Sequence, residues 1–186
     1  MSNNTALLVI DVQVGLIDDP SDLAYNPQTV LANIAALLTK ARATHTPIIF
    51  IQHDGDAYEG EGLSLAPASP GWQIHPQVAP LADEPILRKR ASDSFYQTPL
   101  SDELAARGIQ HLVITGCKTE MCIDTTSRAA ISRGFDVTLV KDAHSTTDSE
   151  IMPSFQIVAH HNYTLDDFGT DEHVIVTKAA SEVDFS

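Results

Sequence analysis

Ala6-Leu-Leu-Val-Ile10, followed at once by Asp11, is the stretch that decides the fold class. Five apolar residues without polar alternation are typical of a strand buried on both faces of a sheet. Similar β-rich runs recur at residues 47–51, 86–87, 112–114, 137–140 and 174–176, and helical periodicities lie between most of them. Asn26-Pro27, for example, is typical of a helix N-cap and first turn. The alternation predicts a doubly wound α/β fold, a mostly parallel six-stranded sheet with helices on both faces.

Length and charge limit the partners that this chain can have. Its 186 residues suit one domain spanning residues 1–186. Lys and Arg number 11 and Asp and Glu number 25, which gives a formal net charge of −14. Such a surface repels phosphate backbones and anionic lipid, so we expect no nucleic-acid and no membrane partner. The start of the chain lacks the basic region of a secretory signal, and we expect a cytoplasmic protein.

The predicted sheet also indicates where a ligand binds, because ligands of such folds lie outside the carboxyl ends of the strands. Those ends carry Asp11, residues 52–54, Lys89, residues 115–122 and Asp142. Residues 53–85 form a long irregular segment rich in Gly, Pro, Ala and Ser. Segments of that length are usually functional or mobile, and we expect this one to shape the pocket.

Cys122 is the strongest candidate nucleophile. It follows the strand at residues 112–115 through a turn that contains Gly116, and we expect it in the first turn of a helix from about Met121 to Arg133. Free N–H groups at a helix start favour the thiolate, so the pKa of this cysteine should be depressed. The same N–H groups could receive an oxyanion. The alternative is a small buried core cysteine.

Asp11 and Lys89 are candidates to assist that sulfur. Asp11 ends a buried strand and could accept the thiol proton, or it could merely form a strand-end turn. Lys89 lies in Arg88-Lys89-Arg90, a basic run at the end of a short strand. Its ammonium could stand between Asp11 and Cys122, or the run could be a solvated cluster.

Two other uses of these side chains remain open at this stage. His53, Asp54, Asp56 and His75 are possible metal ligands, but their spacing is not diagnostic and we predict no metal. Cys117 and Cys122 could form a redox dithiol, although such motifs usually hold two intervening residues. We find no phosphate loop or nucleotide fingerprint, and we expect no cofactor.

Several motifs together resemble the isochorismatase-like cysteine hydrolases, a superfamily that includes nicotinamidase and N-carbamoylsarcosine amidase. They are Leu7-Leu-Val-Ile-Asp-Val-Gln13, Lys89 with Phe95 six residues on, and Gly116-Cys-Lys-Thr-Glu-Met-Cys-Ile-Asp-Thr-Thr126, supported by residues 71–76, 142–146 and 160–162. The resemblance implies a catalytic triad of Asp11, Lys89 and Cys122. It also implies a cis peptide between Cys117 and Lys118, with the Lys118 and Cys122 N–H groups forming an oxyanion hole.

The chain departs from the family pattern at two places. The Asp/His/His metal pattern of nicotinamidases is missing after the second strand, which speaks against a metal and against nicotinamide. Lys118 stands where close relatives commonly carry a neutral residue, and its ammonium either favours an anionic substrate or points to solvent.

The resemblance implies a hydrolase of a small amide, lactam or related C–N bond, acting through a Cys122 thioester. We expect Gln13, His53, Trp72 and Phe95 near a small-molecule substrate, and a homodimer or homotetramer. The alternatives are a vinyl-ether hydrolase of the isochorismatase type, acting on a small carboxylic acid, and a non-catalytic or redox-responsive binding protein.

Overall fold

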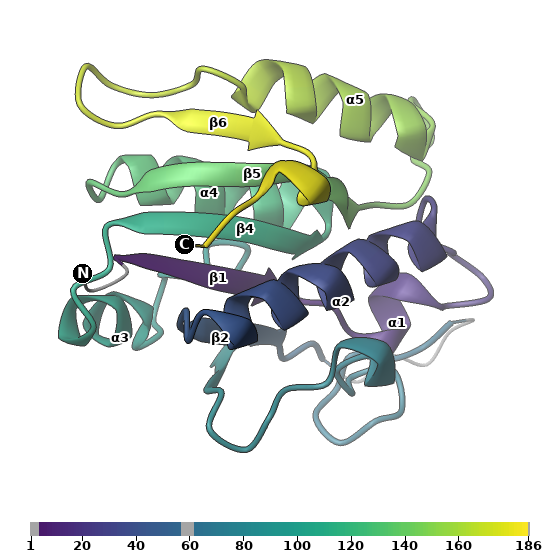
Figure 1. Ribbon diagram of the computed structural model, residues 1–186. Coiled ribbons are helices and arrows are strands. Elements are labelled where there is room, and N and C mark those ends of the chain that lie inside the picture. Colours follow the sequence, from purple (N-terminus) through teal and green to yellow (C-terminus); the bar gives the residue numbers. More distant parts are fainter. Residues whose placement is uncertain (1–3, 57–61, 186) are drawn as a thin grey trace.

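The computed structural model describes residues 4–56 and 62–185, and within these ranges six strands form one parallel sheet (Figure 1). The order across the sheet is β3-β2-β1-β4-β5-β6, and every neighbouring pair is parallel. The strands are β1 (Thr5–Ile10), β2 (Ile48–His53), β3 (Ile86–Lys89), β4 (His111–Cys117), β5 (Asp136–Ser145) and β6 (Ile175–Lys178). The predicted α/β fold is therefore confirmed.

Helices cover both faces of the sheet, as the sequence predicts. Alternate residues of β1 belong to different cores: Leu7 and Val9 pack with α2 (Pro27–Ala43), whereas Leu8 and Ile10 pack with α3 (Leu100–Ala106) and α4 (Asp124–Ile131). Figure 1 shows α2 in front of the sheet and α4 behind it. A further helix, α5 (Ser154–Leu165), packs against β5 and β6. Both faces of the central strands are thus dry, which explains their unbroken apolar runs.

Local details differ from the sequence expectation. Helix α2 begins at Pro27 as predicted, but Asn26 adopts a left-handed backbone and its side chain makes no capping hydrogen bond. The helix expected from Met121 begins instead as a π-helical turn, η2 (Thr119–Ile123), and α4 follows it. The short elements α1 (Val14–Ile17), η1 (Pro76–Val78) and η3 (Ala180–Glu182) are too brief to show a periodicity.

The strand order brings the carboxyl ends of β1 and β4 together at the centre of the sheet. Gly116, near the end of β4, has a φ of +124°, and a Cβ there would lie 1.8 Å from the carbonyl oxygen of Ile10. Only glycine allows such an approach of the two backbones. This close contact places the turn that follows β4 directly beside Asp11, which follows β1.

The irregular segment predicted at residues 53–85 is present, although residues 57–61 lie outside the described part. It returns to the strand ends near Ile74, which pairs with Gln13 in an isolated antiparallel bridge. Within the described ranges, no helix has the length and apolar character that crossing a bilayer requires.

Candidate active site

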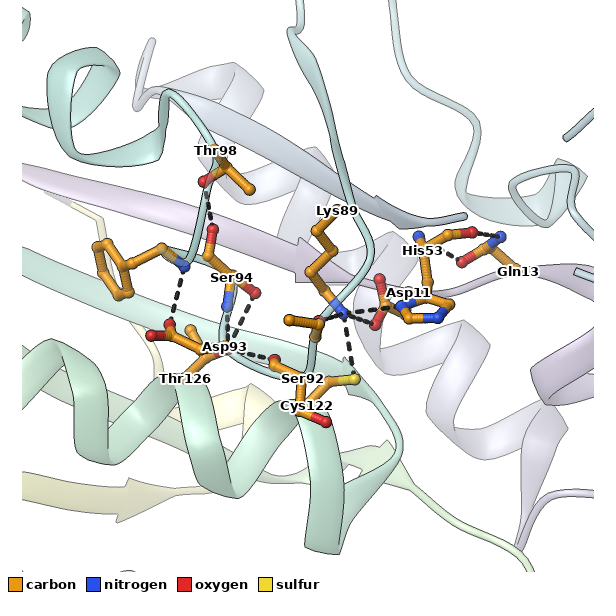
Figure 2. Close-up of polar contacts among 12 residues, drawn as sticks. Asp11, Gln13, His53, Lys89, Ser92, Asp93, Ser94, Thr98, Cys122 and Thr126 are labelled. Atoms are coloured by element: carbon orange, nitrogen blue, oxygen red, sulfur yellow. Dashed lines mark hydrogen bonds and ion pairs between the residues drawn. The ribbon is translucent and has the colours of Figure 1, made fainter. Parts of the chain in front are cut away.

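The structure brings Asp11, Lys89 and Cys122 together at the carboxyl edge of the sheet (Figure 2). The Lys89 ammonium nitrogen lies 2.6 Å from Asp11 Oδ2 and donates a hydrogen bond of 3.2 Å to Cys122 Sγ. It also donates to the carbonyl oxygen of Ala91 at 2.9 Å. The side chains of Asp11 and Lys89 are 0% exposed, so the solvated-cluster interpretation of Lys89 is wrong.

Asp11 is held in an unusual backbone conformation, with a φ of 51°. Its N–H donates to the carbonyl oxygen of Ile51 at 2.9 Å, which fixes it to the end of β2. Within the described chain neither carboxylate oxygen accepts a backbone N–H hydrogen bond, so Asp11 does not form the strand-end turn considered above. A strained backbone and a buried carboxylate that no backbone N–H satisfies are features that collect at functional sites.

The charges of the three groups depend on burial and on one another. Burial raises the pKa of Asp11, and the neighbouring Lys89 opposes that rise. Burial disfavours the charge on Lys89, but Asp11 and then Cys122 outweigh it and raise its pKa, so the ammonium persists. Burial and then Asp11 raise the pKa of Cys122 to about 12, despite the lowering effect of Lys89. The depressed pKa expected for a helix start is therefore wrong, and the resting group is a thiol.

Cys122 lies in η2, close to the opening of the turn that links β4 to α4. The peptide bond between Cys117 and Lys118 is cis. The Lys118 carbonyl oxygen accepts hydrogen bonds from the N–H groups of Met121 (3.1 Å) and Ile123 (3.2 Å), which closes the turn. N–H groups in the first turn of a helix lack intrahelical acceptors, and they are the donors expected for an oxyanion hole.

The two cysteines do not form a pair. Both are free thiols. Cys117 belongs to the core on the α2 face of the sheet, whereas Cys122 packs against the core on the opposite face. Burial raises the pKa of Cys117, which makes it an inert thiol. The placement on opposite faces contradicts the redox dithiol alternative.

A cavity of about 260 Å³ opens beside Cys122. It is lined by Asp11, Leu16, His53, Leu65, Ser92, Lys118, Met121 and Cys122. Of the four residues predicted near the substrate, His53 alone is among these lining residues. Its Nδ1 lies 3.5 Å from the Lys89 ammonium, and burial together with Lys89 lowers its pKa, so it is neutral at pH 7.

Gln13 supports the site from behind. It is fully buried, and its amide nitrogen donates to the carbonyl oxygens of His53 (3.0 Å) and Trp72 (2.9 Å). Its amide oxygen accepts the His53 N–H at 2.8 Å. Gln13 therefore ties the end of β2 to the irregular segment and is not a wall of the cavity.

Trp72 and Phe95 do not line this cavity, contrary to the expectation that they lie near the substrate. Trp72 donates from its indole nitrogen to Asp54 at 2.9 Å, and the Arg88 guanidinium lies 5.0 Å from its ring centre. Phe95 is 5% exposed and stacks on Phe135 in the core. The position of Phe95 follows from the residue before it. The Ser94 N–H donates a hydrogen bond of 3.1 Å to Thr126 Oγ1, which attaches this part of the chain to α4 (Figure 2).

The candidate metal ligands are engaged separately. Asp54 binds Arg88, and Asp56 binds Arg90. His75 contacts Asp18 at 2.9 Å. Among the residues that the structure describes, no three His, Cys, Asp or Glu side chains are grouped as metal ligands would be.

Four residues that line the cavity were not predicted from the sequence: Leu16, Leu65, Ser92 and Met121. Leu16 lies in α1 and Leu65 in the irregular segment, where no periodicity indicates which way a side chain points. Met121 had a usable signal, because it directly precedes the candidate nucleophile.

Comparisons with known proteins agree on one family. Residues 5–160 match the family model described as the isochorismatase domain. A streptothricin hydrolase of Streptomyces noursei is 37% identical over 80% of this chain, and the match spans 57% of that longer protein. A ureidoacrylate amidohydrolase, RutB of Variovorax paradoxus, is 27% identical over 76% of this chain and 69% of its own. The crystal structure of a putative isochorismatase hydrolase from Oleispira antarctica superimposes with a TM-score of 0.86 at 30% identity, covering 98% of this chain and 96% of that one.

Proposed function

Because the chain belongs to the isochorismatase family, we propose that it is a cysteine hydrolase that cleaves a small amide, lactam or related C–N bond. The observation that carries the proposal is the position of Lys89, which contacts Asp11 Oδ2 at 2.6 Å and Cys122 Sγ at 3.2 Å beside an open cavity. Relatives that are a streptothricin hydrolase and an amidohydrolase support the same kind of chemistry.

In the proposed first half-reaction, Cys122 Sγ attacks the substrate carbonyl carbon while its proton moves to Asp11. The proton transfer coincides with attack because the free thiol, with its raised pKa, does not ionise in advance. The tetrahedral oxyanion accepts hydrogen bonds from the backbone N–H groups of Lys118 and Cys122. Asp11 then returns the proton to the leaving nitrogen, the C–N bond breaks, and an acyl thioester remains on Cys122.

In the second half-reaction, water attacks the thioester carbonyl and gives its proton to Asp11. The C–S bond breaks, the carboxylic acid leaves, and Asp11 returns the proton to the Cys122 sulfur. Lys89 stays protonated throughout, because Asp11 and Cys122 both raise its pKa. It stabilises whichever of the two groups carries the negative charge at each step.

The test is a screen of small primary amides for release of ammonia, with Cys122→Ala beside the wild type. The variant should lose activity by a factor on the order of 10³ or more, because no covalent route remains. Cys117→Ala is the matched control, since Cys117 lies on the other face of the sheet, and it should keep activity within a few-fold.

The same pair of variants distinguishes the alternatives. If Cys122→Ala hydrolyses its substrate at the wild-type rate, the covalent mechanism is wrong and the vinyl-ether chemistry becomes the better account. If the wild type neither releases ammonia from a broad panel of small primary amides nor opens small lactams, the proposed C–N specificity is wrong.

A further inference from the structure

Lys118 brings a cation to the rim of the cavity, but that cation is already bound. Its ammonium donates to Thr147 Oγ1 at 2.8 Å and to Asp22 Oδ2 at 3.1 Å. The Lys118 side chain is 20% exposed and the Asp22 side chain 52% exposed, so the pair lies at the boundary between cavity and solvent. Lysine stems commonly cover apolar surface while the charged end is held elsewhere. Lys118 thus supplies a wall whose charge is compensated.

The other lining residues add no free positive charge. Asp11 is paired with the ammonium of Lys89, which does not itself line the cavity, and His53 is neutral because burial and Lys89 lower its pKa. The remaining side chains of the described lining are Leu16, Leu65, Met121 and Ser92, together with the thiol. A substrate carboxylate placed here would lose its hydration without gaining a cation, and this is unfavourable.

We propose that the Lys118–Asp22 pair is a specificity determinant that restricts the cavity to small uncharged substrates. The inference rests on the proposed function and narrows it to uncharged amides. Lys118 is the specificity residue, and Asp22 is a positioning residue that acts by holding and neutralising its ammonium. The cavity volume of about 260 Å³ lies below the roughly 300–1,000 Å³ of pockets that hold drug-sized ligands, and it favours a compact substrate.

Alkylation of Cys122 tests the charge selectivity without a known substrate. Iodoacetamide and iodoacetate have nearly the same size and differ in charge. With either reagent the sulfur forms a C–S bond, iodide leaves, and the thiol proton is released. The thiolate fraction of Cys122 affects both rate constants equally, so it drops out of their ratio. Modification of Cys122 is followed by mass spectrometry, with Cys122→Ala to identify the site.

Cys122 of the wild type should prefer iodoacetamide over iodoacetate, and this preference should be about tenfold stronger than that of the free thiol 2-mercaptoethanol. Asp22→Asn removes the carboxylate that neutralises the Lys118 ammonium, which Thr147 still holds, and the iodoacetate-to-iodoacetamide ratio should rise about 3- to 10-fold, as expected for one uncompensated charge at the rim of a partly solvated cavity. Lys118→Met leaves Asp22 uncompensated and should lower the ratio. The double variant restores the wild-type charge at the rim, and its ratio should return close to that of the wild type.

Glu103→Gln is the matched control, because it removes the same charge from a carboxylate on α3 that is paired with Arg107, and α3 leads to the amino end of β4 and not to the strand ends that carry Cys122. It should leave the ratio unchanged. An equal rise in Asp22→Asn and Glu103→Gln would overturn the inference, because the effect would then come from net charge alone. An unchanged ratio in Asp22→Asn would overturn it as well.

Hydrolysis of two isosteric amides separates this inference from the proposed function. In 4-methylpentanamide an isopropyl group replaces the carboxylate of succinamate. Suppose that the wild type hydrolyses 4-methylpentanamide, but Asp22→Asn does not change the ratio of the hydrolysis rates of the two amides. This result would refute the charge selectivity and leave the proposed function intact. If the alkylation ratios are as predicted but no small amide is hydrolysed, the proposed function is refuted and the charge selectivity is supported. If neither reagent modifies Cys122, the cavity is not open and both proposals are wrong.

Discussion

Replacing Lys89 with methionine should destabilise the protein far more than its position on a four-residue strand suggests. The substitution keeps most of the side-chain volume of Lys89 and removes the ammonium. It leaves the Asp11 carboxylate buried, with the nearest compensating charge gone. Lys89 contacts Asp11 at 2.6 Å, and both side chains are 0% exposed. The cost therefore comes from an isolated buried charge and not from lost packing.

The structure allows an estimate of this cost. At an effective dielectric constant of about 20, two charges about 2.6 Å apart attract by about 6 kcal/mol. The desolvation of Lys89, which the variant no longer suffers, reduces the net effect, and breaking a buried pair typically costs about 3–5 kcal/mol. With a urea m-value of about 2 kcal/mol per molar, the midpoint of unfolding should fall by about 2 M at pH 7.

The pH dependence of this loss follows from Asp11. Burial already raises the pKa of Asp11 above its ordinary value of 3.8, and without Lys89 the pKa rises further. A carboxyl whose pKa is raised by folding stabilises the fold while protonated, and that stability is lost as pH rises through the folded-state pKa. The difference in the free energy of unfolding between wild type and Lys89→Met should therefore become smaller as pH is lowered from 7 toward 4.

Urea unfolding of four proteins measures this prediction. Asp11→Asn combined with Lys89→Met should recover most of the stability, because no charge is then buried alone. Arg88→Met, next to Lys89 on β3, breaks the ion pair between Arg88 and Asp54, in which the Arg88 side chain is 49% exposed, and should cost no more than about 1 kcal/mol. The reasoning is refuted if the double variant is as unstable as Lys89→Met, or if the loss does not depend on pH.

Two further predictions concern Cys122 and Phe95. The rate of Cys122 alkylation by iodoacetamide should climb about tenfold per pH unit between pH 7 and 10, since burial and Asp11 raise its pKa to about 12; a plateau near pH 8.5 would contradict the assigned environment. Phe95→Ala should lower the free energy of unfolding by about 3–5 kcal/mol in a urea titration, because the ring is buried against Phe135. Its kcat/KM for any amide substrate should stay within about twofold of the wild type, and a selective rise in KM would instead place the ring at the substrate.

The grouping of Asp11, Lys89 and Cys122 could be predicted because parallel strands align their carboxyl ends. Asp11 follows β1, Lys89 ends β3, and Cys122 follows β4 through a short turn, so each is placed by a strand that its apolar run makes visible. Helical connections fix the parallel direction of most of these strands, whereas β2 and β3 are joined by the irregular segment and the short η1. The grouping of these three residues thus follows from the chain topology, and the topology can be predicted from the hydrophobic pattern of the sequence.

The direction of individual side chains could not be predicted in the same way. Phe95 lies six residues beyond Lys89, but the Ser94–Thr126 hydrogen bond turns it into the core, and nothing in the spacing indicates that contact. Leu65 reaches the cavity from a segment without periodicity. The pKa of Cys122 depends on burial and on the distance to Asp11, neither of which a local helix-start argument includes.

In the proposed mechanism, the charges in this site allow a thiol with a raised pKa and a buried carboxylate to work together. Before the proposed attack the three groups hold a carboxylate, an ammonium and a neutral thiol, and after proton transfer they would hold a carboxylic acid, an ammonium and an anionic sulfur or its adduct. The net charge of the buried site is zero in both states, so the step demands no new charge separation from the protein interior. Lys89 contacts both Asp11 and Cys122 and needs no movement to follow the negative charge from one to the other. Ionisation of Cys122 alone would be costly. Here the negative charge only moves from Asp11 to the sulfur, and both groups share the Lys89 ammonium as their counterion. A buried site favours this form of electrostatic preorganisation.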